Sequence, residues 1–447
     1  MSESVGNNLF KLPHNPQSLK WFSCTKRKGP MNQLTQFLFF NKHTGFDKTR
    51  EHDAEISASP IRYRVPSLDL VKGLAMIIMA LDHTRDYVHS SAFLFDPSDP
   101  AQTTLAIFFT RWVTHFCAPA FSLLAGISVY LVAKRKSPLA LSEFLLKRGI
   151  WLVFIEFTVV GFGWFFDFSF GTYMLGVIWS LGISMIVLAG LIHLPRSVIL
   201  TFSIIMIFGH NLLDAIDDKD SVGWAILHFQ NVFYLSENIF LLVAYPIIPW
   251  IAVMSFGFCM GSYYDRSVYP VIRKTTFSLV GGSAIVLFAV LRYSNLYGDP
   301  QDFVNHGSLS KILISFLNPT KYPPSLLFLL MTLGGTLLLL AYSEKWKGKV
   351  VEFICTFGRV PFFYYIIHIY MIHLIAIALA SMSGFTWKKN IALAGWGVLE
   401  NPIPGYGFPL WAVYGVWLLV IMLMYPLCLR FDRYKMSNKD KWWLSYF

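Results

Sequence analysis

Long apolar segments separated by short polar loops recur along most of the chain. A helix in contact with lipid needs roughly 20 consecutive, mainly apolar residues. Segments of about that length predict ten crossings. They fall near residues 64–89, 105–133, 149–166, 173–193, 197–213, 238–260, 276–294, 324–342, 358–380 and 409–429. We therefore expect an all-α polytopic membrane protein, a bundle of about ten transmembrane helices.

The first of these segments differs from the others because it is polar at both ends. Only the nine residues between Lys72 and Asp82 are free of charge. Charges this deep in a span usually face a bundle interior or a wet cavity. Steps of three and four residues place one polar track, interrupted by two methionines, on a single helix face. The track consists of Asp69, Lys72, Met76, Met79, His83 and Asp86.

Composition supports the membrane assignment and excludes some partners. The chain is 55% hydrophobic and 14% charged, against about a quarter charged in soluble domains. Its net charge of +11 does not indicate nucleic acid, because lysine and arginine gather in loops on one side, including Lys134–Lys136 and the Lys147-Arg148 pair before the third span. The positive-inside rule then places both termini in the cytoplasm. The five cysteines show no ligand spacing, so neither disulfides nor a metal site is expected.

Residues 1–60 are mixed and polar, without a signal peptide. They are interpreted as a disordered cytoplasmic tail, or as the result of a start assigned too far upstream, with Met31 or a later residue the true beginning. Residues 61–447 then form one transmembrane domain. Within it, the glycine pairs at 281–282 and 334–335 predict close helix packing.

Several charged and histidine side chains crowd the far end of the first span. Asp82, His83, Asp86 and His89 are joined by Arg111 and His115 of the second span, which lie four residues apart. Arg111 can pair with Asp82 or Asp86, which leaves His83 or His115 free to titrate near neutral pH. The alternative is a buried ion-pair network that only holds two helices together.

Three further polar residues lie later in the chain. Lys321 precedes the eighth span and is suited to bind an anionic group. Tyr364 and His368 share a face of the ninth span, where they are either satisfied core residues or part of a substrate site.

The first span also carries a motif, S-L-D-L-V-K-G-L-A-M-I-I-M-A-L-D-H-T-R-D over residues 67–86. It resembles the opening helix of the heparan-α-glucosaminide N-acetyltransferase catalytic-domain family, in particular a bacterial branch of it. Supporting stretches are residues 111–119, 321–326, 357–368 and 441–445. The charged segment 82–86 departs from the family pattern, which is uncharged and contains glycine there.

The resemblance implies an enzyme of a bacterial inner membrane that passes an acetyl group from cytoplasmic acetyl-CoA to a hydroxyl or amine of an extracytoplasmic glycan. The family's active histidine, just beyond the first helix, corresponds to His83 or His89. On this hypothesis His83 acts as general base or forms a transient acyl-histidine, oriented by Asp82 or Asp86.

The remaining assignments follow from that hypothesis. Lys72 and Arg359 bind the phosphates of CoA. The acceptor site comprises Arg111, His115, Lys321, Tyr364 and His368. The bilayer and a glycan are the expected partners, and a homo-oligomer is left open. The alternative function is a proton-coupled transporter of a sugar or lipid-linked intermediate, for which an intramembrane His/Asp/Arg cluster is equally suited; a catalytically inactive sensor or assembly protein is a third.

Overall fold

The structure is a computed structural model, which describes residues 65–386, apart from 94, 96, 217 and 306, and residues 405–446. The tail expected over residues 1–60 lies outside the described residues. So do residues 387–404 of the last long loop, with Lys388 and Lys389.

The described residues are mostly helical. The long and short α-helices are α3 (Pro66–Val88), α4 (Leu105–Trp112), α5 (Cys117–Ala133), α6 (Pro138–Ile155), α7 (Gly161–Phe165), α8 (Val177–Leu191), α9 (Arg196–Gly209), α10 (Val222–Leu227), α11 (Ile247–Met260), α12 (Pro270–Ser294), α13 (Leu309–Leu317), α14 (Leu326–Ser343), α15 (Lys349–Arg359), α16 (Pro361–Met382) and α18 (Leu410–Ser437). Tighter or wider turns extend or follow several of them: η2 (Ser90–Phe93), η3 (Val113–Phe116), the π-helical η4 (Glu156–Val160), η5 (His210–Ala215), η6 (Gly261–Tyr264) and η7 (Trp442–Ser445).

Seven of the described helical segments are long and apolar enough to cross a membrane. They start at Leu105, Arg196, Ile247, Pro270, Leu326, Pro361 and Leu410, close to seven of the ten predicted spans. The other three predicted spans correspond to α3, to the α6–α7 segment and to α8. α3 is long enough but carries its charges inside the span, and α8 has only 15 residues.

The boundaries of the third predicted span are wrong at its start. Apolar length predicts a start at residue 149, but α6 begins at Pro138. Ser137 caps the helix by accepting a hydrogen bond from the Ala140 amide, and proline suits the first helical turn. Lys147 and Arg148 therefore lie within a helix and not in a loop.

A small sheet corrects the expectation of an all-α protein. Its order is β1 (Thr172–Leu175), β3 (Ile239–Val243) and β2 (Asn231–Ser236), with β1 parallel and β2 antiparallel to β3. β1 and β3 are apolar and lead directly into α8 and α11. Because a short apolar run does not distinguish a strand from a buried helix, both strands fall inside predicted spans.

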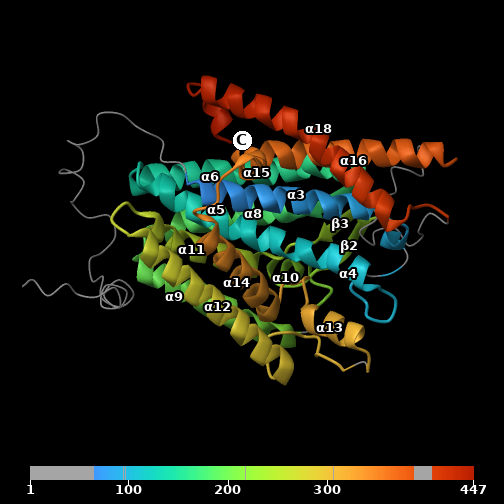
Figure 1. The fold of residues 1–447 in the computed structure, drawn as a ribbon, viewed down its shortest axis with the longest axis horizontal. Helices are drawn as coiled ribbons and strands as arrows, with labels where there is room; N and C mark the ends of the chain where they lie inside the picture. Colours follow the sequence, from blue (N-terminus) through green and yellow to red (C-terminus); the bar gives the residue numbers. More distant parts are fainter. Residues whose placement is uncertain are drawn as a thin grey trace, which may run out of the picture. The chain divides into compact units, whose positions relative to one another are not determined.

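α3 is the central element around which the functional region is built. It packs against α15, α16, α18, α5 and α14, and Figure 1 shows it in blue beside α5 and α15. The closest approach is to α15, where a side chain on Gly73 would meet the Ile354 carbonyl and one on Gly358 would meet the Asp69 carbonyl. The glycine of the Lys72-Gly73 pair is thus required by backbone contact.

The prediction of close packing at the two glycine pairs is confirmed for Gly281 and for both Gly334 and Gly335, where a Cβ on Gly335 would lie 2.7 Å from a ring carbon of Phe116. Gly281 of α12 and Gly334 of α14 face each other, and a Cβ on either would lie within 3.0 Å of the other's carbonyl oxygen. Gly282 has open space around it. Small residues let these helix backbones approach closely, as in membrane bundles generally.

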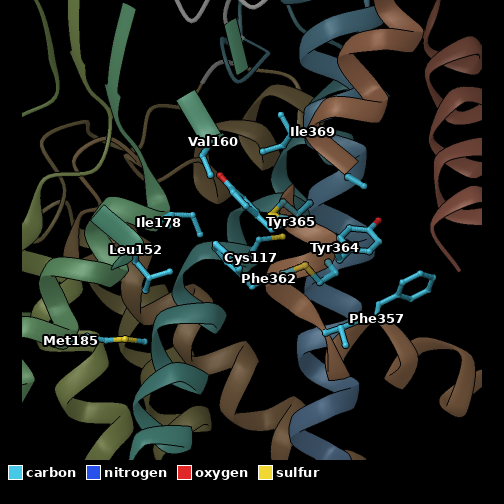
Figure 2. Close-up of a cluster of buried hydrophobic side chains, with 14 of the residues drawn as sticks. Cys117, Leu152, Val160, Ile178, Met185, Phe357, Phe362, Tyr364, Tyr365 and Ile369 are labelled. Atoms are coloured by element: carbon cyan, nitrogen blue, oxygen red, sulfur yellow. The ribbon is translucent and has the colours of Figure 1, made fainter. Parts of the chain in front are cut away.

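Buried apolar side chains fill the space between the central helices, while others remain exposed on the outer ones. Figure 2 shows Leu152, Ile178 and Met185 on one side, with Cys117 and Phe362 opposite. Large apolar side chains are exposed along α9, α12 and α18. Exposure of this extent suits contact with lipid chains, so the helices indicate a bilayer environment and a multi-pass membrane protein.

Candidate functional site

A cavity of about 260 Å³ runs beside α3. Four residues of the predicted polar track, Lys72, Met76, Met79 and His83, line its wall, as the helical spacing predicted. The rest of the wall is mainly apolar and comes from α5, α6, α8 and α16. The described structure therefore contains a mainly apolar cavity whose wall carries a few charged side chains and one histidine.

The first end of the cavity carries two basic side chains. Lys72 of α3 donates a hydrogen bond of 2.9 Å from Nζ to Ser128 Oγ of α5, and Arg148 of α6 lies on the same wall. Val132 and Phe144 line this end as well, next to the basic loop after α5. Apolar length alone predicts a loop at Arg148, so this residue was not among the predicted site residues. The available signal was the Ser137-Pro138 helix start, which places Arg148 about three turns inside α6.

The second end of the cavity holds a buried cluster of charges. Asp82 Oδ1 lies 3.1 Å from Arg85 Nη2, and its Oδ2 pairs with Arg111 and lies 3.8 Å from Lys321 Nζ. Asp86 pairs with Arg85 at 2.5 Å. Two carboxylates thus face three cations at this end of the cavity. The predicted pairing of Arg111 with Asp82 is present, and Arg85, which the site assignments left out, links the two acids.

Lys321 reaches this cluster from a turn that precedes α14. Asp299 holds the turn by accepting hydrogen bonds from the Thr320 amide (2.8 Å) and the Ser325 hydroxyl (2.8 Å). His210 adds a bond of 2.8 Å from Nε2 to the Pro324 carbonyl. The Ser325 hydroxyl also caps α14 by accepting from the Phe328 amide. The ammonium group is therefore presented by an anchored turn.

His83 lies beside the charge cluster but hydrogen-bonds elsewhere. Its Nδ1 is 2.8 Å from Nε2 of His368 on α16, and the two rings stack. The rings of Trp164 and Tyr365 contact His83 edge-on. Among the described residues, Nε2 of His83 has no hydrogen-bond partner, and the His83 side chain lines the cavity. Asp82 and Asp86, which were expected to orient His83, pair with arginines in the structure, and His83 Nδ1 is hydrogen-bonded to His368 instead.

The other predicted site residues lie outside the lining of this cavity. His89 follows α3, where its Nδ1 accepts a hydrogen bond of 3.2 Å from the Ser91 amide. His115 is buried against Phe328, and its Nδ1 has no partner among the described residues.

Two further predicted site residues, Arg359 on α15 and Tyr364 on α16, also lie outside the cavity lining. Arg359 pairs with Glu352 and with Asp432. Tyr364 is fully buried; Figure 2 shows it pointing away from Leu152 and Met185, which line the cavity. Neither residue lines the cavity in the described structure.

The arrangement is suited to proton transfer next to a group that gains negative charge. An imidazole with one unoccupied ring nitrogen can take a proton from a hydroxyl or an amine. A nearby ammonium group stabilises negative charge strongly in a region that excludes water. Within the described residues, no group of three or more His, Cys, Asp or Glu side chains is placed to hold a metal ion.

The fold and the cavity together define a polytopic membrane protein with a histidine and a charge cluster buried beside one central helix. A family model described as heparan-alpha-glucosaminide N-acetyltransferase, catalytic, matches residues 64–291. The match covers half of the chain, and the chain belongs to this family. The family is one of transmembrane acetyltransferases that use acetyl-CoA as donor. A comparison with curated proteins found no match.

Proposed function

We propose that this protein is an integral membrane acetyltransferase that moves an acetyl group from cytoplasmic acetyl-CoA to a hydroxyl or amine of an extracytoplasmic or envelope glycan. The observation that carries the proposal is the cavity beside α3. It has Lys72 and Arg148 at one end and His83 with Lys321 at the other.

The residues at the first end fit the donor. Lys72 and Arg148 supply positive charge for the phosphate groups of CoA, since charge-assisted hydrogen bonds to phosphate are among the strong ones. The apolar wall beyond them, which includes Met76 and Met79, suits the uncharged arm that ends in the thioester. Arg359 is engaged by two acids, so we assign the phosphates to the two cavity residues instead.

The separation of Lys72 and His83, which both line the cavity, suits a donor that is bound at one end and reacts at the other. Lys72 and His83 are three helical turns apart, about 16 Å along the axis at 1.5 Å per residue. A donor held by its phosphates near Lys72 would extend along the methionine face of α3 toward His83. The acceptor would enter from the side of the Lys321 turn.

At the reacting end, the thioester supplies an activated acyl carbon. We infer that His83 Nε2 takes the proton from the acceptor oxygen or nitrogen as that atom bonds to the acyl carbon. The carbon–sulfur bond breaks, and the sulfur receives the proton that His83 carries. Lys321, the cation of the cluster that lines the cavity, stabilises the negative charge that develops on the carbonyl oxygen. The products are the acylated acceptor and CoA with a free thiol, and His83 returns to its starting state.

The orientation of the chain in the membrane forms part of the proposal. α3, the α6–α7 segment and α8, added to the seven long apolar helices, would give about ten crossings if each spans the bilayer. Both termini then lie in the cytoplasm, with residues 61–447 as one domain in a bacterial inner membrane. The basic loop at Lys134–Lys136 supports this orientation. It places the Lys72 end of the cavity on the side where CoA is available.

The test uses the full chain, purified and placed in lipid nanodiscs. Radiolabelled acetyl-CoA is incubated with the protein and with total envelope glycans. We expect label in the glycan fraction and stoichiometric release of CoA, both abolished in His83→Gln. Absence of label transfer and of CoA binding by the wild type would overturn the proposal. Substrate flux across proteoliposomes without CoA consumption would favour the transporter instead.

A further inference from the structure

His368 is a buried residue whose two ring nitrogens both have defined neighbours. Its Nδ1 lies 2.9 Å from the Tyr364 carbonyl oxygen one turn earlier on α16. Its Nε2 lies 2.8 Å from Nδ1 of His83 on α3. The side chain is completely buried and does not line the cavity, so it is not placed to contact a substrate.

These neighbours fix where the protons are in the neutral pair. A carbonyl oxygen can only accept, so His368 Nδ1 carries a proton and donates it to Tyr364. Nε2 of a neutral His368 is then an acceptor, and the bond between the two rings requires a proton on His83 Nδ1. That leaves Nε2 of His83 without a proton. This is the ring nitrogen that has no protein partner among the described residues.

We propose that His368 is a positioning residue, which holds His83 in the tautomer protonated at Nδ1 so that Nε2 can take the acceptor's proton. The proposal rests on the acetyltransferase function proposed above and deepens it. It assigns to an uncharged imidazole the role that a carboxylate commonly has toward a catalytic histidine.

The surroundings explain why a neutral partner is used here. The two carboxylates that neighbour His83 along α3, Asp82 and Asp86, are occupied by arginines in the charge cluster. An additional carboxylate facing His83 in the interior would need its own compensating charge. A histidine held by a backbone carbonyl orients His83 without that cost. The stacked arrangement of the two rings also restricts rotation of the His83 ring.

Three variants on α16 separate positioning from a general effect on packing. His368→Phe keeps a ring of similar size but removes the acceptor for His83 Nδ1. His368→Gln retains a carbonyl oxygen that can accept the same hydrogen bond. His373→Phe is the matched control: His373 is also fully buried on α16 and bonds a backbone carbonyl, that of Gly163, at 3.0 Å.

The first readout is kinetic, with acetyl transfer measured on full-length protein in nanodiscs. We expect His368→Phe to lower kcat about 10–100-fold, less than the 10²–10⁴-fold cost of losing the acid–base group itself, with KM for acetyl-CoA unchanged. His368→Gln should recover part of the loss, and His373→Phe should resemble wild type. A higher acceptor KM at normal kcat would assign His368 to substrate binding and overturn the proposal. So would a wild-type kcat in His368→Phe.

The second readout is spectroscopic and needs no activity. Nitrogen-15 spectra of histidine-labelled protein distinguish protonated from unprotonated ring nitrogens, and His83→Gln identifies the His83 signals. We expect His83 to be protonated at Nδ1 alone in the wild type and to show a mixture of tautomers in His368→Phe. A wild-type His83 protonated at Nε2 would overturn the proposal whatever the kinetics. If the wild type transfers no acetyl group, the proposed function fails, and the spectra still report separately whether His368 sets the tautomer.

Discussion

Lys72 and His83 stand on the same face of α3 and line the same cavity, one at each end. Between them the helix presents Met76 and Met79 to that space. One helix therefore connects a basic end, with Arg148, to an end where an imidazole lies beside three cations and two carboxylates. Because the two ends of the cavity have different chemistry, we expect substitutions at the basic end to affect donor binding. We expect substitutions at the other end to affect turnover or stability.

Substitution of His83 tests the proton transfer. Glutamine preserves hydrogen bonding but cannot take up a proton, so His83→Gln should lower kcat by about 10²–10⁴ while the protein still folds. His89→Gln is the control, because His89 bonds locally to Ser91 outside the cavity, and it should remain active. Turnover and a melting curve are measured for both. An inactive His89 variant beside an active His83 variant would move the base to His89.

The charge cluster predicts unequal costs for its members. Asp82→Asn leaves Arg111 and Lys321 without their carboxylate, so it should destabilise by about 3–5 kcal/mol, the usual range for a broken buried pair. Arg111→Met should cost less, because Arg85 and Lys321 still face Asp82. Thermal unfolding in detergent compares the two variants. The opposite order would show that Arg111 is the dominant partner of Asp82.

Donor binding should depend on the basic end of the cavity. Loss of one charge-assisted hydrogen bond costs about 1.5–3 kcal/mol, so Lys72→Met and Arg148→Met should each raise KM for acetyl-CoA about 10–100-fold. kcat should change much less, since neither residue lies near the reacting end. Arg359→Met, which removes a cation outside the cavity lining, should leave this KM unchanged. A raised KM in Arg359→Met alone would return the phosphate site to α15.

The orientation predicts which lysines react with an impermeant amine reagent outside intact cells. Lys134, Lys147 and Lys347 should be protected, whereas Lys219 and Lys311 should be labelled. Mass spectrometry of tryptic peptides gives the pattern, and permeabilised cells provide the positive control. Labelling of Lys134 in intact cells would reverse the orientation and assign the basic end of the cavity to the outside.

Sequence periodicity determined the membrane class and the polar face of α3, and the glycine pairs indicated close helix packing without naming the partner helix. These features depend on residues close together along one helix, or on a small side chain that only close packing requires. The family motif around Lys72-Gly73 was also readable, and backbone contact between α3 and α15 supplies its physical reason.

The tertiary structure decided the partners of the candidate site. The sequence suggested a carboxylate for His83, because Asp82 and Asp86 are its neighbours along the helix; packing instead brings His368, 285 positions away, against it. The structure also shows that Arg148 lies inside α6, because Ser137 and Pro138 start that helix earlier than apolar length alone indicates. Strands β1 and β3 could not be separated from the spans they adjoin, since pairing between distant segments, and not local pattern, makes them strands. Contacts between residues far apart in the chain leave no periodic signal in a single sequence, and these contacts position the buried histidine.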